Sequence, residues 1–343
     1  MTAPAPAAAE LERLAVEMVV PVRWDDGPSQ PVPESEAAFE EYLRAVARWC
    51  DVTVVDGSQG PHAASRRDRW GNVARVLVPA KRWAGSNGKV SGAMTGIEAA
   101  RHPTVVLADD DVRYDYGSLA SLVSAMASAD VVAPQNVSTT WPWWARWEAG
   151  RILVNRAFAA DWPGTFGLRR DLVLRADGWS TEALFENLEM VRTVQAAGGR
   201  YQRRPDILVR REPPSLDHFL RQRVRQAYED QAQPLRCLVA LSVVPAVLLG
   251  RRRPVRLVGG AAATAALAEV GRRRAGGTAA FPASTSLFAP LWALERGVCA
   301  WAAVVVRLRG GVVYHGRRVP LAASSRRRLR RELAERELRL SGR

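Results

Sequence analysis

The sequence has few cysteines and almost no lysine. Its three cysteines, Cys50, Cys237 and Cys299, are far apart in the chain and match neither a metal site nor a disulfide framework, which favours a reducing compartment. The N-terminal segment contains acidic residues and no long apolar core, so it is not expected to be a signal peptide. We therefore expect the N-terminal part of the chain to lie in the cytosol.

Positive charge is abundant, and nearly all of it is arginine. The net charge is +14, yet Lys81 and Lys89 are the only lysines. The arginines concentrate in the second half, in runs at 251–256, 271–277 and 324–343. These runs flank apolar stretches, as basic residues do beside a membrane, and no nucleic-acid-binding signature accompanies them. The charge therefore predicts a membrane as partner and no nucleic acid.

From about Val16 to Pro234, short β-branched runs alternate with helical patterns. Strands separated by helices of this length predict an α/β domain with a mainly parallel sheet covered on both faces. Ligands bind such sheets beyond the carboxyl ends of the strands. The patterns predict strands at 16–22, 51–57, 74–80, 104–111 and 130–134, and helices at 35–50, 87–102 and 119–129.

After Pro234 the chain is mostly apolar, in segments at 235–250, 255–271 and 287–308. A membrane-spanning helix needs about 20 apolar residues. The first two segments are short and the third contains Glu295 and Arg296, so a soluble helical domain is the alternative to a spanning or re-entrant membrane region. We favour the membrane region, and expect three parts: a domain over 1–234 (1–14 disordered), a helical membrane-associated region over 235–310, and a basic cytosolic tail over 311–343.

Three consecutive carboxylates, Asp109, Asp110 and Asp111, follow the apolar run of the strand at 104–111. Like charges this close repel one another, so a positive group is expected to neutralise them. Alternation along a strand allows Asp109 and Asp111 to point the same way, and hard oxygen ligands suit Mg²⁺ or Mn²⁺. The alternative is a helix N-cap or a solvated turn, where aspartate is also common.

Two other segments bear on the same end of the sheet. Asp56 ends the strand at 51–57, where it is either a turn residue before Gly57 or an acceptor of hydrogen bonds from a nucleoside. The glycine-containing stretch at 85–93 contains Lys89, and is either a loop that caps a helix or a contact for a diphosphate. It lacks the spacing of a P-loop.

Taken in order, "VVPVRW", "VVDGS", "NGKVSGAMTGIEAA" and "VVLADDDV" resemble a family 2 glycosyltransferase of the GT-A fold, membrane-associated and inverting. The segment 164–190 is similar to that family's acceptor-side segment, and "RQRVRQ" at 221–226 to its Gln-x-x-Arg-Trp motif. The resemblance implies a GT-A domain over 1–234. The positions implied for the nucleotide sugar are Pro21, Val22, Arg23, Asp56, Lys89, Asp109, Asp110, Gln222 and Arg225, and those implied for the metal are Asp109 and Asp111.

The chain departs from the family pattern at two positions. The family usually has Glu-Asp at the start of the acceptor helix, with the Asp as catalytic base, whereas this chain has Glu186 and Asn187. An amide does not accept a proton usefully near neutral pH. Glu186 or Glu189 is then the candidate base, because residues three apart share a helix face; a charged helix N-terminus is the alternative. Gln226 replaces the tryptophan of the second motif, which weakens the case for a processive synthase.

The resemblance implies transfer of a sugar from a nucleotide-diphosphate sugar to an acceptor hydroxyl, with inversion and with Mg²⁺ or Mn²⁺. The acceptor is expected to be a lipid or lipid-linked glycan, because the site adjoins the predicted membrane region. Two other functions remain open. A nucleotidyltransferase would use the same fold, and a non-catalytic membrane scaffold would retain the fold without the base.

Overall fold

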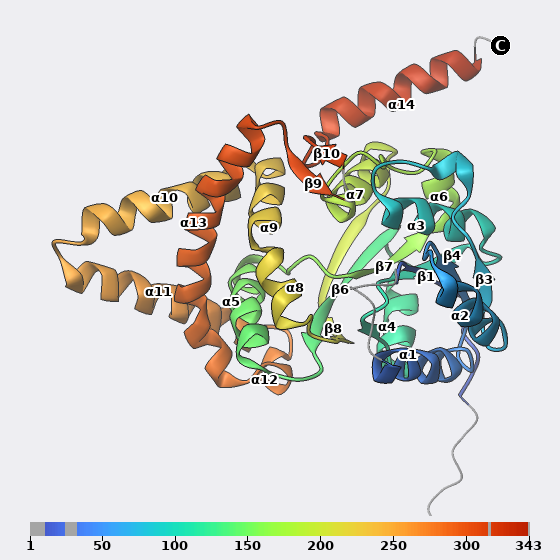
Figure 1. Cartoon of the computed structure of the whole chain (residues 1–343), viewed down its shortest axis with the longest axis horizontal. Coiled ribbons are helices and arrows are strands. Elements are labelled where there is room, and N and C mark those ends of the chain that lie inside the picture. Colours follow the sequence, from blue (N-terminus) through green and yellow to red (C-terminus); the bar gives the residue numbers. More distant parts are fainter. Residues whose placement is uncertain (1–10, 25–32, 315–316, 342–343) are drawn as a thin grey trace, which may run out of the picture.

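The computed structural model describes residues 11–24, 33–314 and 317–341. Its centre is an eight-stranded sheet with the order β3-β2-β1-β4-β7-β6-β8-β5 (Figure 1). β7 is antiparallel to both neighbours and β5 is antiparallel to β8, while the other pairings are parallel. The strands are β1 (Glu17–Val22), β2 (Asp51–Asp56), β3 (Arg75–Leu77), β4 (Thr104–Ala108), β5 (Val112–Arg113), β6 (Val131–Ser138), β7 (Thr165–Arg169) and β8 (Tyr201–Arg211).

Helices cover both faces of this sheet, each over its own apolar core. On one face, side chains of α1 and α4 such as Phe39 and Leu122 are fully buried against β1 and β4. On the other face, Met94 of α3 and Met190 of α7 belong to a second buried cluster. The mixed, mostly parallel α/β fold predicted from the sequence is therefore confirmed. The covering helices are α1 (Pro33–Val46), α2 (Pro61–Gly71), α3 (Gly88–Ala99), α4 (Tyr116–Ala125), α6 (Arg170–Arg175) and α7 (Glu186–Ala196), with the short η1 (Lys81–Trp83) before α3.

The strand expected at 104–111 ends earlier than predicted. β4 stops at Ala108, so the three aspartates lie in the turn between β4 and β5 rather than on the strand. The strand expected at 74–80 is likewise shorter, since β3 ends at Leu77. Charged side chains do not favour the interior of a sheet, so the strand pattern ends where the carboxylates begin.

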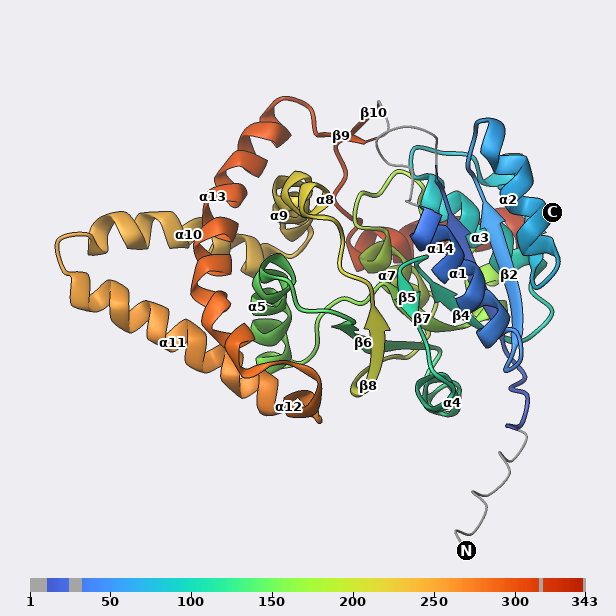
Figure 2. The ribbon, with the colours of Figure 1, turned by 60° about the horizontal axis from the view of Figure 1, so that its bottom comes forward.

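The C-terminal half is helical and lies beside the sheet. α10 (Pro234–Gly250) and α11 (Pro254–Arg273) form a hairpin that projects away from the rest of the molecule (Figures 1 and 2). α13 (Ala289–Leu308) packs across α10, α9 (Arg223–Glu229) and α5 (Trp143–Phe158). Shorter elements connect these helices: α8 (Leu216–Arg221), η2 (Asp230–Ala232), α12 (Gly277–Ala280) and η3 (Ala283–Phe288).

One segment within the described ranges, Ala283–Leu308, is long and apolar enough to cross a membrane, and α10 is apolar but shorter. Besides Arg307 near its end, this segment contains two charged residues, Glu295 and Arg296, and both point inward. Glu295 lies 3.7 Å from Arg223 of α9, and Arg296 lies 3.4 Å from Asp230 of η2. The outer face of the segment is an exposed apolar stripe at helical spacing, formed by Leu287, Leu291, Leu294, Val298, Trp301, Val305 and Leu308.

The segment expected to be a basic tail returns to the α/β domain. The amides of Leu184 and Phe185 donate to the carbonyls of Leu321 and Ala322, at 2.9 and 2.8 Å. A helix from the arginine-rich end then packs on α7, which starts one residue after Phe185. The elements of this end are β9 (Val312–Tyr314), β10 (Arg317–Val319) and α14 (Arg326–Ser341). Residues 1–10, which belong to the N-terminal segment expected to be disordered, lie outside the described ranges.

Candidate active site

The three aspartates after β4 point in two directions. Asp110 turns towards β1 and accepts a hydrogen bond from Trp24 Nε1. Asp109 and Asp111 turn the other way, and both face Arg211 at the end of β8. Arg211 Nη2 is 3.2 Å from Asp109 Oδ2, and Arg211 Nε is 2.9 Å from Asp111 Oδ2. Asp109 and Asp111 therefore share one side of the turn, as alternation along the chain predicts.

Lys89 is the second cation at this site, and the start of α3 positions it. The side chain of Asn87 caps the helix by accepting from the amides of Lys89 and Val90. α3 lies close to β1 because Gly96 faces Val19, where a Cβ atom would come within 2.3 Å of Val19 Cγ1. This packing brings Lys89 Nζ to 2.6 Å from a carboxylate oxygen of Asp109.

The charges of the site compensate one another. Burial alone would lower the pKa of Lys89, but Asp109 and Glu186 outweigh it and raise that pKa. Burial alone would also lower the pKa of Arg211, but Asp111 and Asp109 outweigh it and raise that pKa. Asp110 differs, because burial and then the neighbouring Asp111 raise its pKa to about 6. Arg211 is the neutralising group that the sequence alone did not identify, since about a hundred residues separate it from the aspartates.

A cavity of about 140 Å³ opens beside Lys89 and Asp109. Glu186, at the start of α7, faces this cavity and places Oε1 2.9 Å from Lys89 Nζ. Five of the site residues predicted from the sequence therefore line one cavity: Lys89, Asp109, Glu186, Gln222 and Arg225. Other cavity residues include Arg211, Asn187, Gln226, Glu229, Asp230, Arg236 and Arg296.

The residues expected to hold the nucleoside lie together at the ends of β1 and β2, outside the lining of this cavity. Val22 pairs with Asp56 in the parallel register, directly after Pro21. Arg23 follows, with Nη1 about 3.8 Å from where a Cβ atom of Gly88 would lie. The Asp56 carboxylate is fully buried and already has protein partners, Arg67 Nε at 2.7 Å and the Ser58 amide at 2.9 Å.

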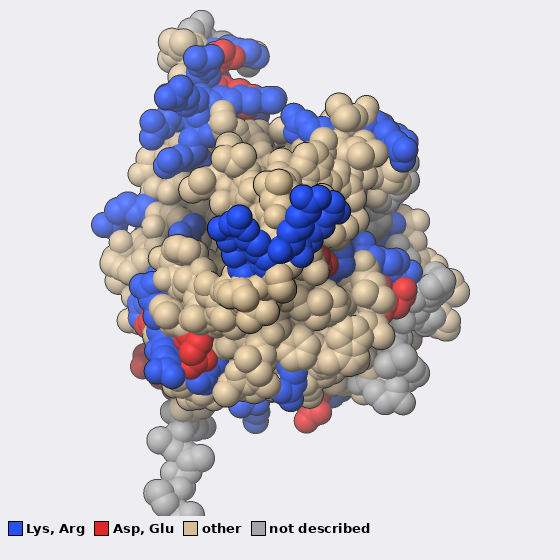
Figure 3. Space-filling view, turned by 90° about the vertical axis from the view of Figure 1, so that its left-hand side faces the viewer, with Lys and Arg blue, Asp and Glu red and all other residues tan. Residues whose placement is uncertain are grey.

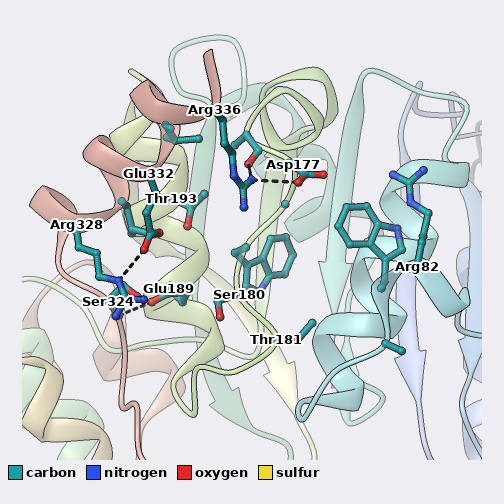
Figure 4. Close-up of a pocket in the computed structure, with 17 residues that line it drawn as sticks. Arg82, Asp177, Ser180, Thr181, Glu189, Thr193, Ser324, Arg328, Glu332 and Arg336 are labelled. Atoms are coloured by element: carbon teal, nitrogen blue, oxygen red, sulfur yellow. Dashed lines mark hydrogen bonds and ion pairs between the residues drawn. The ribbon is translucent and has the colours of Figure 1, made fainter. Parts of the chain in front are cut away.

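Glu189 does not face the cavity that Glu186 lines. It is fully buried on the other side of α7, where Oε2 accepts a hydrogen bond from the Ser324 amide at 2.5 Å. Burial raises the pKa of Glu189, and the Ser324 amide offsets part of that effect. Figure 4 shows this side chain beside a second cavity, of about 400 Å³, between α7, α14 and residues 176–181. Of the two glutamates predicted as candidate bases, Glu186 therefore lines the cavity beside Asp109 and Glu189 does not.

The donor set at Asp109 and Asp111 fits a divalent cation in part. Among the residues that the structure describes, Asp111 Oδ1 is buried without a hydrogen-bond partner, and carboxylate oxygens suit Mg²⁺ or Mn²⁺. However, no group of three or more acidic, histidine or cysteine side chains in the described residues is arranged to hold a metal. The remaining ligands would have to come from water and from a substrate diphosphate, as is usual for Mg²⁺. The residues present therefore fit a cation that binds together with a nucleotide.

Comparison with known proteins bears on the fold and on the class of protein. The sequence model of glycosyl transferase family 21 matches residues 63–142, a range that contains Lys89 and the three aspartates. The structure is similar to that of the mannosyltransferase PcManGT from Pyrobaculum calidifontis, solved in complex with GDP-Man and Mn²⁺. That likeness has a TM-score of 0.51 at 17% identity and covers 88% of this chain and 89% of the other. The chain has the fold of a GT-A glycosyltransferase.

A second solved structure, described as a nucleotide-diphospho-sugar transferase from Desulfovibrio desulfuricans, has a TM-score of 0.36 at 12% identity. It covers 56% of this chain and 80% of the other. A search of curated proteins finds no match. The GT-A fold and the family 21 match together support a glycosyltransferase, which confirms the predicted resemblance to glycosyltransferases of the GT-A fold.

Proposed function

We propose that this GT-A glycosyltransferase transfers a sugar from a nucleotide-diphosphate sugar to a hydroxyl of a membrane-bound acceptor, with inversion and with Mg²⁺ or Mn²⁺. The observation that carries the proposal is the cavity shared by Lys89, Asp109, Arg211 and Glu186. It combines carboxylates for a cation with fixed positive charge, at the carboxyl end of β4, where ligands of α/β sheets bind.

The chemistry requires one displacement. The acceptor oxygen attacks the anomeric carbon on the face opposite the diphosphate, and the new C–O bond forms as the bond to the diphosphate breaks. The diphosphate leaves with the electron pair, and a carboxylate takes the hydroxyl proton. Lys89 and Arg211 supply positive charge near the leaving diphosphate, where preorganised charge lowers the barrier. A divalent cation, when bound, neutralises further charge on that diphosphate.

The helices behind the cavity support a membrane-bound acceptor. Arg236 of α10 and Arg296 of α13 line the cavity, while the opposite faces of the same two helices are apolar and exposed. We define the membrane face as the α10–α11 hairpin together with the outer stripe of α13. Figure 3 views the molecule from the side of the hairpin and shows a broad uncharged surface with a group of basic side chains at its centre. Exposed arginines 251–253 occupy the tip of the hairpin.

Apolar side chains of this kind are expected in the hydrocarbon of a bilayer, and arginines at its headgroups. The contiguous apolar exposure on α10, α11 and α13 exceeds what isolated surface residues explain. We therefore propose that this face rests on or enters the cytosolic side of a membrane, with the α/β domain in the cytosol. An acceptor anchored in the bilayer would then reach the cavity along α10 and α13.

Val298 tests the membrane face, and Val78 provides a matched control. Both valines are 56% exposed, but Val298 lies on the outer stripe of α13 and Val78 lies on the α/β domain. Val298→Asp is expected to weaken binding to phosphatidylglycerol-containing vesicles about tenfold or more, because a charge inside the bilayer costs about 2.5 kcal/mol. Val78→Asp should bind like the unmodified protein. Equal binding by both variants in a flotation assay would contradict the proposal.

The donor is the first property to measure. The similar mannosyltransferase was solved with GDP-Man and Mn²⁺, so GDP-mannose is the first donor to test. We expect detergent-solubilised protein to bind one of GDP, UDP and dTDP more tightly with Mn²⁺ than with EDTA, and to release that nucleotide from its sugar. Calorimetry and a nucleotide-release assay measure these two steps separately.

The nucleotide-binding and nucleotide-release assays, together with an assay of nucleotide-sugar formation, separate the two rival functions from sugar transfer. Asn187 lines the cavity where the family has its base, which favours a non-catalytic scaffold. Binding of a nucleotide without release of it from a sugar would support that scaffold. Formation of a nucleotide sugar from a nucleoside triphosphate and a sugar phosphate would identify a nucleotidyltransferase instead.

A further inference from the structure

Besides Asp109, three acidic side chains face the cavity: Glu186, Glu229 and Asp230. Glu186 is 2.9 Å from Lys89 Nζ. Asp230 is paired with two arginines, of α10 and α13, at 3.6 and 3.4 Å. Before either of these two carboxylates accepts a proton from a substrate, an existing ion pair must be broken.

Glu229 is held less tightly. It is the last residue of α9, and 18% of its side chain is exposed. Arg225 Nε lies 3.7 Å from Glu229 Oε1, which is beyond hydrogen-bonding distance. Glu229 is therefore open to the cavity and has one long ion pair among the described residues, with Arg225, whereas Asp230 has two ion pairs.

The surroundings of Glu229 favour proton uptake near neutral pH. Burial, above all, raises its pKa to about 7; Arg225 opposes this effect and the nearby Glu186 adds to it. A base works best when its pKa lies near the working pH. The charged groups that interact with Glu229 come from every side of the cavity: Glu186 of α7, Arg225 of α9, Asp230 of η2, Arg296 of α13 and Arg151 of α5.

The position where the family has its base cannot serve in this chain. Asn187 Nδ2 donates to the Pro163 carbonyl at 3.2 Å, and an amide has no useful basicity. Asn187 and Glu229 line the same cavity from different helices. The carboxylate that the family has at the position of Asn187 is thus absent from this chain, and Glu229 of α9 supplies a carboxylate to the same cavity.

We propose that Glu229 is the general base of the transfer reaction. This assignment rests on the proposed function. The acceptor hydroxyl gives its proton to the Glu229 carboxylate as its oxygen bonds to the anomeric carbon, and the diphosphate leaves with the electrons of the broken C–O bond. Glu186 remains paired with Lys89 and positions that lysine beside Asp109.

The test compares Glu229→Gln with Glu186→Gln and with Glu335→Gln, an exposed control on α14. The readouts are calorimetric nucleotide binding, and release of GDP from GDP-mannose with water and octyl glucoside as acceptors. If a nucleotide other than GDP binds, a nucleotide-diphosphate sugar of that nucleotide replaces GDP-mannose in the assay. In the unmodified protein, kcat is expected to rise with pH through about 7, because the base acts when ionised. Glu229→Gln should lower kcat on the order of 10²-fold or more, abolish that rise, and leave nucleotide affinity within about threefold.

A second variant distinguishes a base from a structural residue. Adding Asn187→Asp to Glu229→Gln restores a carboxylate at the family position and is expected to recover part of kcat. Activity of Glu229→Gln within threefold of the unmodified protein, or loss of nucleotide binding together with activity, would overturn the assignment. Nucleotide binding without any turnover in the unmodified protein would refute both the transfer reaction and its base. Absence of nucleotide binding would refute the proposed function at the donor step.

Discussion

Replacing Asp109 and Asp111 together with alanine is expected to lower kcat/KM for the donor on the order of 10³-fold. The two carboxylates share one side of the turn after β4, and in the proposed function they would hold the divalent cation that helps to bind the diphosphate. Their loss would also remove the two carboxylates that pair with Arg211 at 2.9 and 3.2 Å, and would leave Lys89 paired with Glu186 alone among the described residues. The measurement is nucleotide release at several Mn²⁺ concentrations, together with nucleotide binding.

The control for this variant is Asp171→Asn, on the exposed surface of α6, where the carboxylate pairs only with Arg175 among the described residues. It should leave both readouts unchanged. Retention of Mn²⁺-dependent nucleotide binding by the double variant would mean that the acidic triplet is a structural turn. The metal and donor assignments would then be wrong, while the GT-A fold would remain.

Gly271→Ala is expected to destabilise the helical half by about 3 kcal/mol or more. α11 crosses α5 at this glycine, and a Cβ atom there would lie 1.8 Å from the carbonyl oxygen of Leu153. The obstacle is backbone, so a side-chain rotation cannot relieve it. The helices must separate, which also disturbs Arg156, a fully buried arginine that donates to the Gly271 carbonyl.

Gly260→Ala in the same helix is the matched control. Apart from the neighbouring residues and backbone of its own helix, no described atom lies within 4 Å of a Cβ atom at this position, so the change is expected to stabilise α11 slightly, by about 0.5–1 kcal/mol. Thermal unfolding of the detergent-solubilised variants, followed by circular dichroism, measures both effects. Equal melting temperatures for the two variants would show that α11 does not dock on α5 in solution.

The aspartates after β4 and the helix crossing at Gly271 contribute to the proposed function in different ways. In the proposed function, the three aspartates after β4 take part in donor binding, whereas the crossing at Gly271 fixes the base of the hairpin that forms much of the proposed membrane face. On heating, a protein with Gly271→Ala is therefore expected to retain nucleotide binding in its α/β domain to a higher temperature than it retains the packing of α10 and α11. Loss of nucleotide binding and of this packing at the same temperature would indicate that the chain unfolds as one cooperative unit.

The sequence alone determined the class of fold, and it predicted where the donor would bind. Short β-branched runs between amphipathic helices specify an α/β sheet, because strand and helix periods differ and are local properties. Asp109 and Asp111 could likewise be assigned to the end of β4 from an apolar run that stops at charged residues. The apolar segments of the second half were also evident, since their composition needs no knowledge of the fold.

Tertiary structure decided which charges meet. Arg211 reaches the aspartates only because β8 pairs with β5, and no sequence spacing encodes that distance. Glu186 and Glu189 are three residues apart on one helix, yet α7 separates two cavities and each glutamate faces a different one. Glu295 and Arg296 counted against a membrane segment in the sequence, but they point into an ionic cluster and leave the outer stripe of α13 apolar. Local patterns fix each residue's place on its own element, whereas its partners depend on how distant elements pack.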